Sequence, residues 1–219
     1  LALPSFNLGI FQLTLMERSN IFFQKRKTIK TINLNLLRNT NKMNKYPEIL
    51  TEITTFILDI DGVLTDGSVI IEPTGEQTRT MNIKDGFALQ LAVKRGFKVA
   101  IILGGKNEIV KKRFTGLGIH DIYMGASNKW EAFDELKLTY DLIDQEIAYM
   151  GDDIPDYEIM NTIGLPACPN DAATEIKQIA QYISPIAGGK GCVRDVIEKV
   201  MRAQNKWFNP EKIDEAKIW

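Results

Sequence analysis

The sequence predicts an α/β fold: a Rossmann-like, three-layer sandwich with helices on both faces of a central parallel sheet. Two observations lead to this prediction. From residue 53 onward, short apolar runs alternate with stretches of about a dozen residues that carry apolar positions at helical spacing. This alternation is typical of strands joined by crossover helices. Glycines or acids follow most of the apolar runs, as expected where parallel strands end beside a ligand.

Residues 53–117 contain two predicted strands, a predicted hairpin and two predicted helices. "ITTFILD" (53–59) is an apolar strand, and 68–72 and 77–82 flank the turn "PTGE", which predicts a β-hairpin. "DGFALQLAVKR" (85–95) has helical spacing and ends at a glycine, a typical C-cap. "KVAIIL" (98–103) is a continuous apolar strand, and a helix over 107–117 stops at "GLG".

The second half repeats the pattern of strand followed by helix. Strands are expected at "DIYMG", "EIAYM", "GLPACP" and "YISP", which are residues 121–125, 146–150, 164–169 and 182–185. Helices are expected at 128–140, 155–162, 172–180 and 191–204.

Composition divides the chain into three parts. Residues 1–42 hold seven basic residues and one acid, and we expect them to be a disordered or non-native extension. Residues 43–205 form the predicted α/β domain, and 206–219 a C-terminal tail. The chain beyond residue 42 is net acidic, which argues against a nucleic-acid partner. No run approaches the roughly 20 apolar residues of a membrane helix.

Acids and a lysine follow the predicted strands at one edge of the sheet. Asp59 and Asp61 come after the first strand, and Asp152 and Asp153 come after "EIAYM". Lys129 stands at the start of a helix. Because the carboxyl ends of parallel strands share one edge, these side chains are expected to converge. Several carboxylates around one point require a cation, and hard oxygen ligands suit Mg²⁺.

This chemistry suits phosphoryl transfer. An ionised Asp59 beside a bound electrophile can act as a nucleophile. Asp61 points to the same side of an extended chain, where it can protonate the leaving oxygen and later activate water. Lys129 would offset the charge of the phosphate dianion.

The motifs "DIDGVLTDG", "SNKWEAF" and "GDDIPD" resemble those of the haloacid dehalogenase-like phosphatases. Together with "NIKDG" and "AGGKGCVRDV", they resemble the 3-deoxy-D-manno-octulosonate 8-phosphate phosphatase family over residues 53–204. This resemblance implies that Asp59 is nucleophile and Mg²⁺ ligand, and that Asp61 is acid/base and binds the ion through its backbone carbonyl. Asp152 would complete the metal site, and Asp153 would lie next to the ligands without binding the ion itself.

The resemblance also implies a cytoplasmic enzyme of lipopolysaccharide precursor synthesis that assembles as a homotetramer. The gaps after Asp61 and after Lys129 have no room for a cap domain beyond the hairpin at 68–82. In the family, the hairpins build the tetramer and a neighbouring subunit helps to cover the site. "AGGKG" (187–191) matches the covering segment, and its glycines suit a mobile cover.

Two positions depart from the family pattern. Leu103 stands where the family has a Thr or Ser that binds the phosphate, and Gly105 stands where it has an arginine. Losing one such donor costs on the order of 10²–10³ in rate. We expect substrate contacts, the backbone amides at 104 and 105 among them, from the following residues: Asn82, Lys84, Asp85, Gly104, Gly105, Lys106, Arg113, Gly188 and Gly189.

The leading interpretation is a Mg²⁺-dependent phosphatase of an eight-carbon sugar acid phosphate. One alternative is the same reaction on a nine-carbon ulosonate 9-phosphate. A second is a weakened binding or assembly protein, because of Leu103. A third, a receiver-type signalling domain, has its acidic pair before a lone phospho-acceptor Asp, whereas here "DID" comes first and "GDD" late.

Overall fold

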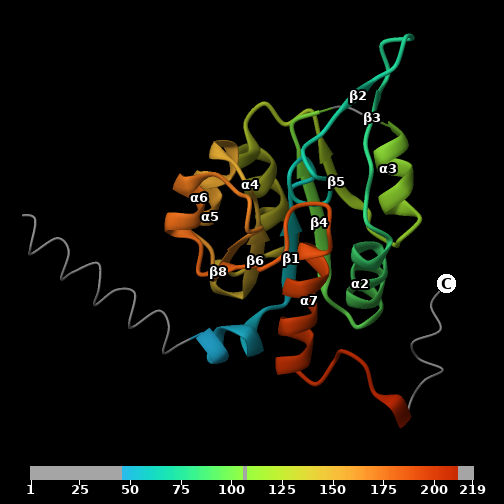
Figure 1. Cartoon of the computed structure of the whole chain (residues 1–219). Helices are drawn as coiled ribbons and strands as arrows, with labels where there is room; N and C mark the ends of the chain where they lie inside the picture. Colours follow the sequence, from blue (N-terminus) through green and yellow to red (C-terminus); the bar gives the residue numbers. More distant parts are fainter. Residues whose placement is uncertain (1–45, 106–107, 212–219) are drawn as a thin grey trace, which may run out of the picture. The chain divides into compact units, whose positions relative to one another are not determined.

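A computed structural model describes residues 46–105 and 108–211. Six parallel strands form the central sheet in the order β5-β4-β1-β6-β7-β8 (Figure 1). Their bounds are β1 Thr55–Leu58, β4 Lys98–Leu103, β5 Asp121–Met124, β6 Ile147–Met150, β7 Leu165–Cys168 and β8 Tyr182–Ile183. The first strand among the described residues therefore lies inside the sheet, between β4 and β6.

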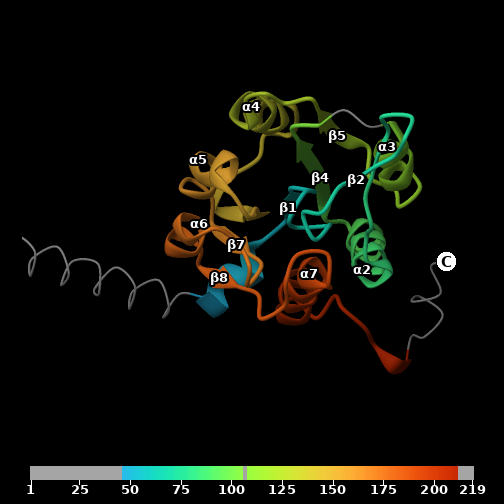
Figure 2. The ribbon, with the colours of Figure 1, turned by 45° about the horizontal axis from the view of Figure 1, so that its top comes forward.

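Helices cover both faces of this sheet, as Figure 2 shows. One face packs against α2 Ile83–Lys94, α3 Glu108–Thr115 and α7 Cys192–Ala203. The other packs against α4 Lys129–Tyr140, α5 Tyr157–Met160 and α6 Thr174–Ile179. Short 3₁₀ turns, η1 Asp144–Glu146 and η2 Ile154–Asp156, flank β6. The predicted three-layer α/β sandwich is confirmed.

The strands divide the core because successive side chains point to opposite faces. On β1, Phe56 and Leu58 pack on the α2 and α7 side, whereas Ile57 packs on the α4 side. On β6, Met150 follows the first set and Tyr149 the second. The position of a residue along its strand therefore determines which of the two helical layers its side chain contacts.

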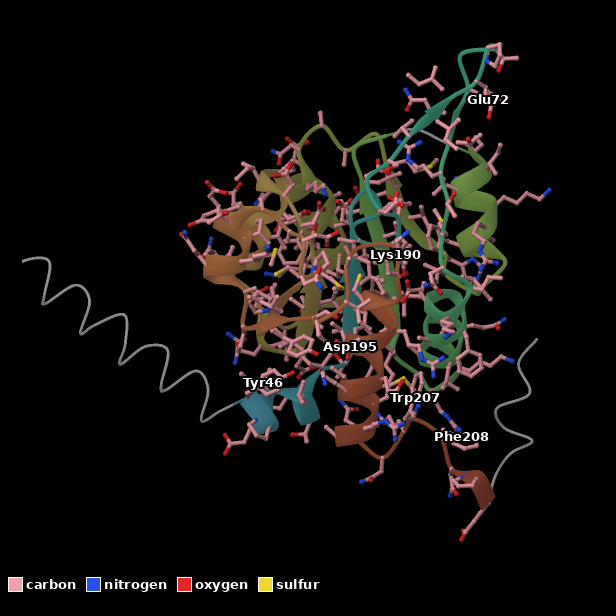
Figure 3. The ribbon with its side chains drawn as sticks, in the orientation of Figure 1. Tyr46, Glu72, Lys190, Asp195, Trp207 and Phe208 are labelled. Atoms are coloured by element: carbon pink, nitrogen blue, oxygen red, sulfur yellow. The ribbon has the colours of Figure 1, made fainter. Side chains whose placement is uncertain are left out.

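The predicted hairpin forms a small sheet of its own, from β2 Ile70–Ile71 and β3 Gln77–Thr78. Both strands are shorter than predicted. The Glu72 amide donates to the Glu76 carbonyl at the turn, and the hairpin extends away from the main sheet with Glu72 near its tip (Figure 3). No second domain stands between these strands in the described chain, which agrees with the expected uncapped fold.

Three local features differ from the sequence prediction. Helix α2 begins at Ile83, because the Asn82 side chain caps it by accepting from the Lys84 amide at 2.8 Å. The helix predicted over 155–162 is divided into η2 and α5. Residues 46–52 form an unpredicted helix, and the Tyr46 ring stacks on Tyr182.

Several predictions fall on residues that the structure does not describe. The extension over residues 1–42 and Lys106 lie outside the described residues, as does most of the tail from residue 206. Within that tail, Trp207 is buried edge-on against Phe87. Among the described helices, none is both long enough and apolar enough to cross a bilayer.

Candidate active site

The loop that follows β1 carries the first pair of acids. The Asp59 amide donates to the Met150 carbonyl at 3.0 Å, which extends the pairing of β1 with β6 by one residue. The loop then turns tightly, because the amides of Val63, Leu64 and Thr65 all donate to the Ile60 carbonyl. The Asp59 carboxylate is thereby fixed at the carboxyl end of the sheet, where it is only 7% exposed.

Lys129 bridges two carboxylates. Its Nζ lies 3.0 Å from Asp59 Oδ2 and 2.7 Å from Asp156 Oδ1. Lys129 is the first residue of α4, and Asn128 caps that helix by accepting from the Trp130 amide. The cap orients the first turn of α4 so that the ammonium group enters the site. Lys129 therefore lies beside the expected nucleophile.

Asp156 is fully buried and makes four hydrogen bonds. Its Oδ1 accepts from Lys129 Nζ and from the Tyr149 hydroxyl at 2.6 Å, and its Oδ2 accepts from the amides of Asp152 and Asp153. Asp156 is the last acid of the motif "GDDIPD", where an acid near a helix start is equally suited to capping. Its contacts link the acidic loop to Lys129.

Three carboxylates form a compact cluster. One oxygen from each of Asp59, Asp152 and Asp156 lies within 4.8 Å of the others. Asp152 Oδ1 is buried and has no hydrogen-bond partner in the described part of the chain. Gly62, at φ +88°, leaves space for Asp152: a Cβ there would lie 2.0 Å from Asp152 Oδ2. An all-oxygen cluster with one unsatisfied carboxylate oxygen fits a Mg²⁺ ion.

The charged groups in this cluster shift one another's pKa values. Burial, together with the Asp156 carboxylate, raises the pKa of Asp59 to about 6. Burial, Asp59 and Asp156 raise the pKa of Asp152 to about 7. Burial alone would lower the pKa of Lys129, but Asp59 and Asp156 together raise it above its ordinary value. The cluster therefore has more negative charge than one lysine offsets, which is the condition a divalent cation relieves.

Asp61 has a partner that the sequence analysis missed. Arg79, directly after β3, donates from Nε to Asp61 Oδ1 at 2.6 Å and from Nη2 to Asp61 Oδ2 at 3.1 Å. This bidentate pair joins the hairpin to the loop of the nucleophile. The two residues are 18 positions apart and share no motif, so no local signal predicts the contact.

Some of the remaining residues in "GDDIPD" and "NIKDG" are exposed to solvent, whereas others are buried. Asp153 is exposed, and Lys84 is exposed on the first turn of α2. Asp85 is 1% exposed and accepts from the Arg194 amide at 2.7 Å, at the start of α7. Burial raises the pKa of Asp85 to about 6. Asn82 and Asp85 therefore have structural partners in α2 and α7, and their predicted substrate contacts stay predictions.

The segment 187–191 packs on the loop of its own chain that carries Asp61. The Gly189 amide donates to the Val63 carbonyl at 2.9 Å, and the Gly188 amide donates to Asp171 Oδ1 at 2.9 Å. A Cβ on Gly188 would lie 2.0 Å from the Gly62 carbonyl oxygen. The glycines thus permit close backbone contact within the chain, and the mobile cover that the family resemblance implies stays a prediction.

Leu103 ends β4 and is 3% exposed. Its side chain belongs to the core on the α2 and α7 side. The Leu103 carbonyl accepts from the Ala126 amide, and the Gly105 carbonyl accepts from the Gly125 amide. Gly104 is exposed, and Arg113 on α3 is half-buried. The predicted phosphate-binding position therefore offers backbone groups but no hydroxyl.

Comparison with known proteins agrees with these motifs. A model of haloacid dehalogenase-like hydrolases matches residues 105–194. The 3-deoxy-D-manno-octulosonate 8-phosphate phosphatase KdsC of Salmonella typhimurium is 37% identical over 174 residues, covering 78% of this chain and 89% of that protein. The protein of the same name from Escherichia coli K12 is 38% identical over 165 residues, covering 75% of this chain and 85% of the relative.

Solved structures show the same fold. A subfamily III A hydrolase of this superfamily from Legionella pneumophila superposes with a TM-score of 0.73 at 34% identity, over 82% of this chain and 96% of that one. A 3-deoxy-D-manno-octulosonate 8-phosphate phosphatase from Moraxella catarrhalis, solved with magnesium, phosphate and KDO, gives 0.72 at 32% identity, over 74% and 94%. The chain belongs to the KdsC family of uncapped haloacid dehalogenase-like phosphatases.

Proposed function

We propose that this protein hydrolyses 3-deoxy-D-manno-octulosonate 8-phosphate to the free sugar acid and phosphate. The observation that carries the proposal is the ion pair of Asp59 and Lys129 inside the acidic cluster, 3.0 Å apart. This ion pair supports the proposal because the Asp59 carboxylate, the proposed nucleophile, has a cation beside it at the carboxyl edge of the sheet. Relatives at 37% and 38% identity carry the name of this reaction.

The residues suggest two chemical steps. A carboxylate oxygen of Asp59 attacks phosphorus, the bond to the sugar oxygen breaks, and the departing oxygen takes a proton from Asp61. Water then attacks the aspartyl-phosphate, Asp61 accepts its proton, and phosphate leaves with Asp59 restored. Lys129 stabilises the negative charge of the phosphoryl group in both steps. Arg79 orients the Asp61 carboxylate through two hydrogen bonds.

Asp59, Asp152 and the backbone carbonyl of Asp61 would hold a Mg²⁺ ion, with Asp153 behind them. When bound, Mg²⁺ supplies positive charge that neutralises the phosphate and keeps Asp59 ionised. Asp156 remains with Lys129 and Tyr149, whose hydrogen bonds already occupy its Oδ1. The Moraxella catarrhalis phosphatase was solved with a magnesium ion.

Phosphate release from this substrate by the full chain, with and without Mg²⁺, tests the proposal. We expect Mg²⁺-dependent turnover in the wild type and its loss in Asp59→Asn. The matched control is Asp134→Asn, which removes an exposed carboxylate from α4 and should retain turnover. A parallel assay on a nine-carbon ulosonate 9-phosphate separates the alternative substrate. A folded wild-type protein that hydrolyses neither sugar phosphate would refute the proposal.

A weakened, non-catalytic role is a second candidate, favoured by the burial of Leu103 in the core. Leu103→Thr distinguishes the two. If the missing hydroxyl limits the rate, this variant gains on the order of 10²–10³ in kcat. It also loses about 1–2 kcal/mol of stability, because a buried apolar group is removed. Unchanged, substantial wild-type turnover would show that backbone amides at 104 and 105 suffice.

The proposal extends to assembly and location. Self-association as a homotetramer is supported by the exposed apolar side chains of Val69, Ile70 and Ile71 on the hairpin, since contiguous exposed apolar groups mark interaction surfaces. The reaction would belong to lipopolysaccharide precursor synthesis in the cytoplasm, as the resemblance implies.

A further inference from the structure

The Thr65 side chain lies inside the loop that follows β1. Thr65 is 0% exposed, although its side chain is polar. A hydroxyl has one hydrogen to donate and two positions at which it can accept. The Thr65 hydroxyl donates to the Ile60 carbonyl at 3.2 Å, and it accepts from the amides of Gly62 and Gly67, each at 3.3 Å. The hydrogen-bonding capacity of this buried group is therefore fully used within one loop.

Two of these partners flank Asp61, the proposed acid/base. The Ile60 carbonyl belongs to the peptide group before Asp61, and the Gly62 amide belongs to the peptide group after it. The third partner, the Gly67 amide, lies where the chain leaves this loop toward β2. One side chain thus holds the backbone on both sides of Asp61 and ties it to the start of the hairpin segment.

The bond to the Gly62 amide also sets the direction of the Asp61 carbonyl. A peptide group is planar and trans, so its N–H and its C=O point in opposite directions. Because the Gly62 N–H points to the Thr65 hydroxyl, the Asp61 C=O points away from that hydroxyl. An amide that donates a hydrogen bond is also polarised, which increases the negative charge on its carbonyl oxygen. Both effects suit a carbonyl that binds a cation.

The same peptide group borders the acidic cluster. A Cβ on Gly62 would lie 2.0 Å from Asp152 Oδ2. The other oxygen of that carboxylate, Asp152 Oδ1, is buried and finds no hydrogen-bond partner among residues 46–105 and 108–211. The peptide group between Asp61 and Gly62 is therefore a neighbour of the carboxylate with the unsatisfied oxygen.

Segment 187–191 closes the other side of the loop. A Cβ on Gly188 would lie 2.0 Å from the Gly62 carbonyl oxygen and 3.0 Å from the Thr65 carbonyl oxygen. The Gly189 amide donates to the Val63 carbonyl at 2.9 Å. This packed backbone limits the access of water to the Thr65 hydroxyl. Removal of the hydroxyl would therefore leave the Gly62 amide without its acceptor.

We propose that Thr65 is a positioning residue of the metal site: its hydroxyl holds the peptide group between Asp61 and Gly62 so that the Asp61 carbonyl is directed at the Mg²⁺ ion. The inference rests on the proposed function, in which that carbonyl is a ligand, and deepens it by naming the side chain that orients the ligand. Groups that hydrogen-bond to ligands contribute to metal affinity without touching the ion.

Calorimetric titration of Mg²⁺ into the metal-free full chain, without substrate, tests this role. Thr65→Val removes the hydroxyl and keeps the branched shape, whereas Thr65→Ser keeps the hydroxyl. The matched control is Thr55→Val. Thr55 is also a buried threonine, 1% exposed on β1, and its hydroxyl pairs with that of Thr54 at 3.4 Å. Thermal unfolding of each variant reports the loss of stability separately.

We expect Thr65→Val to raise the dissociation constant for Mg²⁺ on the order of 10-fold, as for a lost partner of a metal ligand. Thr65→Ser should stay within about 3-fold of the wild type, because its hydroxyl can make the same bonds. Thr55→Val should also stay within about 3-fold, because it has no contact with the site. Equal Mg²⁺ affinities of folded Thr65→Val and the wild type would overturn the inference.

A third variant covers the case in which Thr65→Val does not fold. Thr65→Cys has the shape of Thr65→Ser but offers sulfur, which is a weak acceptor. We expect it to bind Mg²⁺ at least about 3-fold more weakly than Thr65→Ser. Equal affinities of these two variants would refute the orienting role of the hydroxyl.

The binding measurement separates this inference from the proposed function. A wild type that binds Mg²⁺ but hydrolyses no sugar phosphate would refute the proposed function, and the order of affinities among the Thr65 variants would still decide the role of the hydroxyl. A wild type that binds no Mg²⁺ would overturn the inference itself. In an active enzyme, the Mg²⁺ concentration for half-maximal turnover should rise in Thr65→Val by the same factor as the dissociation constant.

Discussion

Asp156 shows at the scale of one residue how a buried carboxylate orders a site. The Lys129 ammonium and the Tyr149 hydroxyl both donate to its Oδ1. Two backbone amides donate to its Oδ2. Burial and the neighbouring carboxylates raise the pKa of Tyr149 well above its ordinary value, so the phenol keeps its proton and remains a donor. Tyr149 therefore positions Lys129 indirectly, through the oxygen that they share.

Tyr149→Phe should impair both stability and turnover. Losing a donor to a buried carboxylate should destabilise the protein by about 1–3 kcal/mol. A displaced Lys129 should lower kcat on the order of 10-fold with little change in KM, because small misplacements near reacting groups slow the chemistry. Urea unfolding and steady-state kinetics measure the two effects. Tyr157→Phe, on an exposed tyrosine of α5, is the control. Equal behaviour of the two variants would contradict this role.

The residue scale also limits what the sequence can predict. Asp59, Asp152 and Lys129 follow strands or begin a helix, so topology alone places them at one edge, and the structure brings them together. Asp156 and Arg79 have no such position. Asp156 is recognised as part of the site only by its complete burial in the fold. Arg79 is recognised only by its contact with Asp61. Burial and long-range pairing are properties of the folded chain.

Two loops packed backbone to backbone shape the site at the scale of elements. Segment 187–191 leads into α7 and lies on the loop that follows β1, with Lys190 Nζ 3.2 Å from Asp66 Oδ2. Lys190 lies above the start of α7 in Figure 3. Gly188 has no space for a side chain, because a Cβ would meet the carbonyl oxygens of Gly62 and Thr65. The position of Asp61 thus depends on α7.

Gly188→Ala should disturb this contact. The added methyl group requires a backbone shift, and such overpacking costs about 1–3 kcal/mol. We also expect lower kcat, because the shifted backbone carries Asp61. Gly116→Ala is the steric control, since its Cβ would lie 3.4 Å from the nearest atom; its stability should stay within about 0.5 kcal/mol of the wild type. Thermal unfolding and phosphate release provide the readouts, and an intact Gly188→Ala enzyme would oppose this interpretation.

Elements were predictable to different degrees. The strand 98–103 coincides with β4, because six consecutive apolar-rich positions between turn residues allow few other boundaries. The hairpin strands were predicted too long, since only Ile70 and Ile71 find ladder partners. The helix predicted over 155–162 fails at its start, where the buried Asp156 side chain bonds to the preceding amides and η2 replaces an α-helical turn.

At the scale of the whole molecule, the hairpin presents apolar side chains away from the core. Ile70 is 58% exposed and Ile71 is 73% exposed. Burying them between subunits would remove this apolar surface from water. The proposed tetramer uses that surface, and the same hairpin supplies Arg79 to the site through the residue after β3. In the proposed tetramer, assembly and catalysis would share one element.

Ile71→Lys should weaken the assembly. A lysine in the contact would add an unpaired charge to a surface that is buried on association. We expect sedimentation to show the tetramer for the wild type and smaller species for the variant. Leu138→Lys, at a position of α4 that is 79% exposed, should leave the assembly unchanged. A monomeric wild type at assay concentrations would contradict the proposed tetramer.

Stability should depend on pH and Mg²⁺ together. The pKa values of Asp59 and Asp152 in the folded chain, about 6 and about 7, lie above the ordinary value of 3.8. The folded chain therefore binds more protons than the unfolded chain between about pH 4 and pH 7. Without metal, this stabilising difference is complete below about pH 4 and is lost as pH rises through 6 and 7.

Added Mg²⁺ should reverse this trend. The ion favours the ionised carboxylates, so it should raise the unfolding midpoint more at pH 8 than at pH 5. Differential scanning fluorimetry at the two pH values, with EDTA or Mg²⁺, measures the effect. In Asp152→Asn the difference between the two pH values should shrink. An Mg²⁺ shift that is equal at both pH values would count against a cation held by these acids.

The strand order has a consequence for the synthesis of the protein. β1 leaves the ribosome first, yet it pairs with β4 on one side and with β6 on the other. Until residues 147–150 have emerged, one side of β1 is an open edge that can pair with another nascent chain. A chain stalled before that point also lacks Asp152 and Asp156. Incomplete chains are therefore prone to aggregate and have no complete acidic cluster.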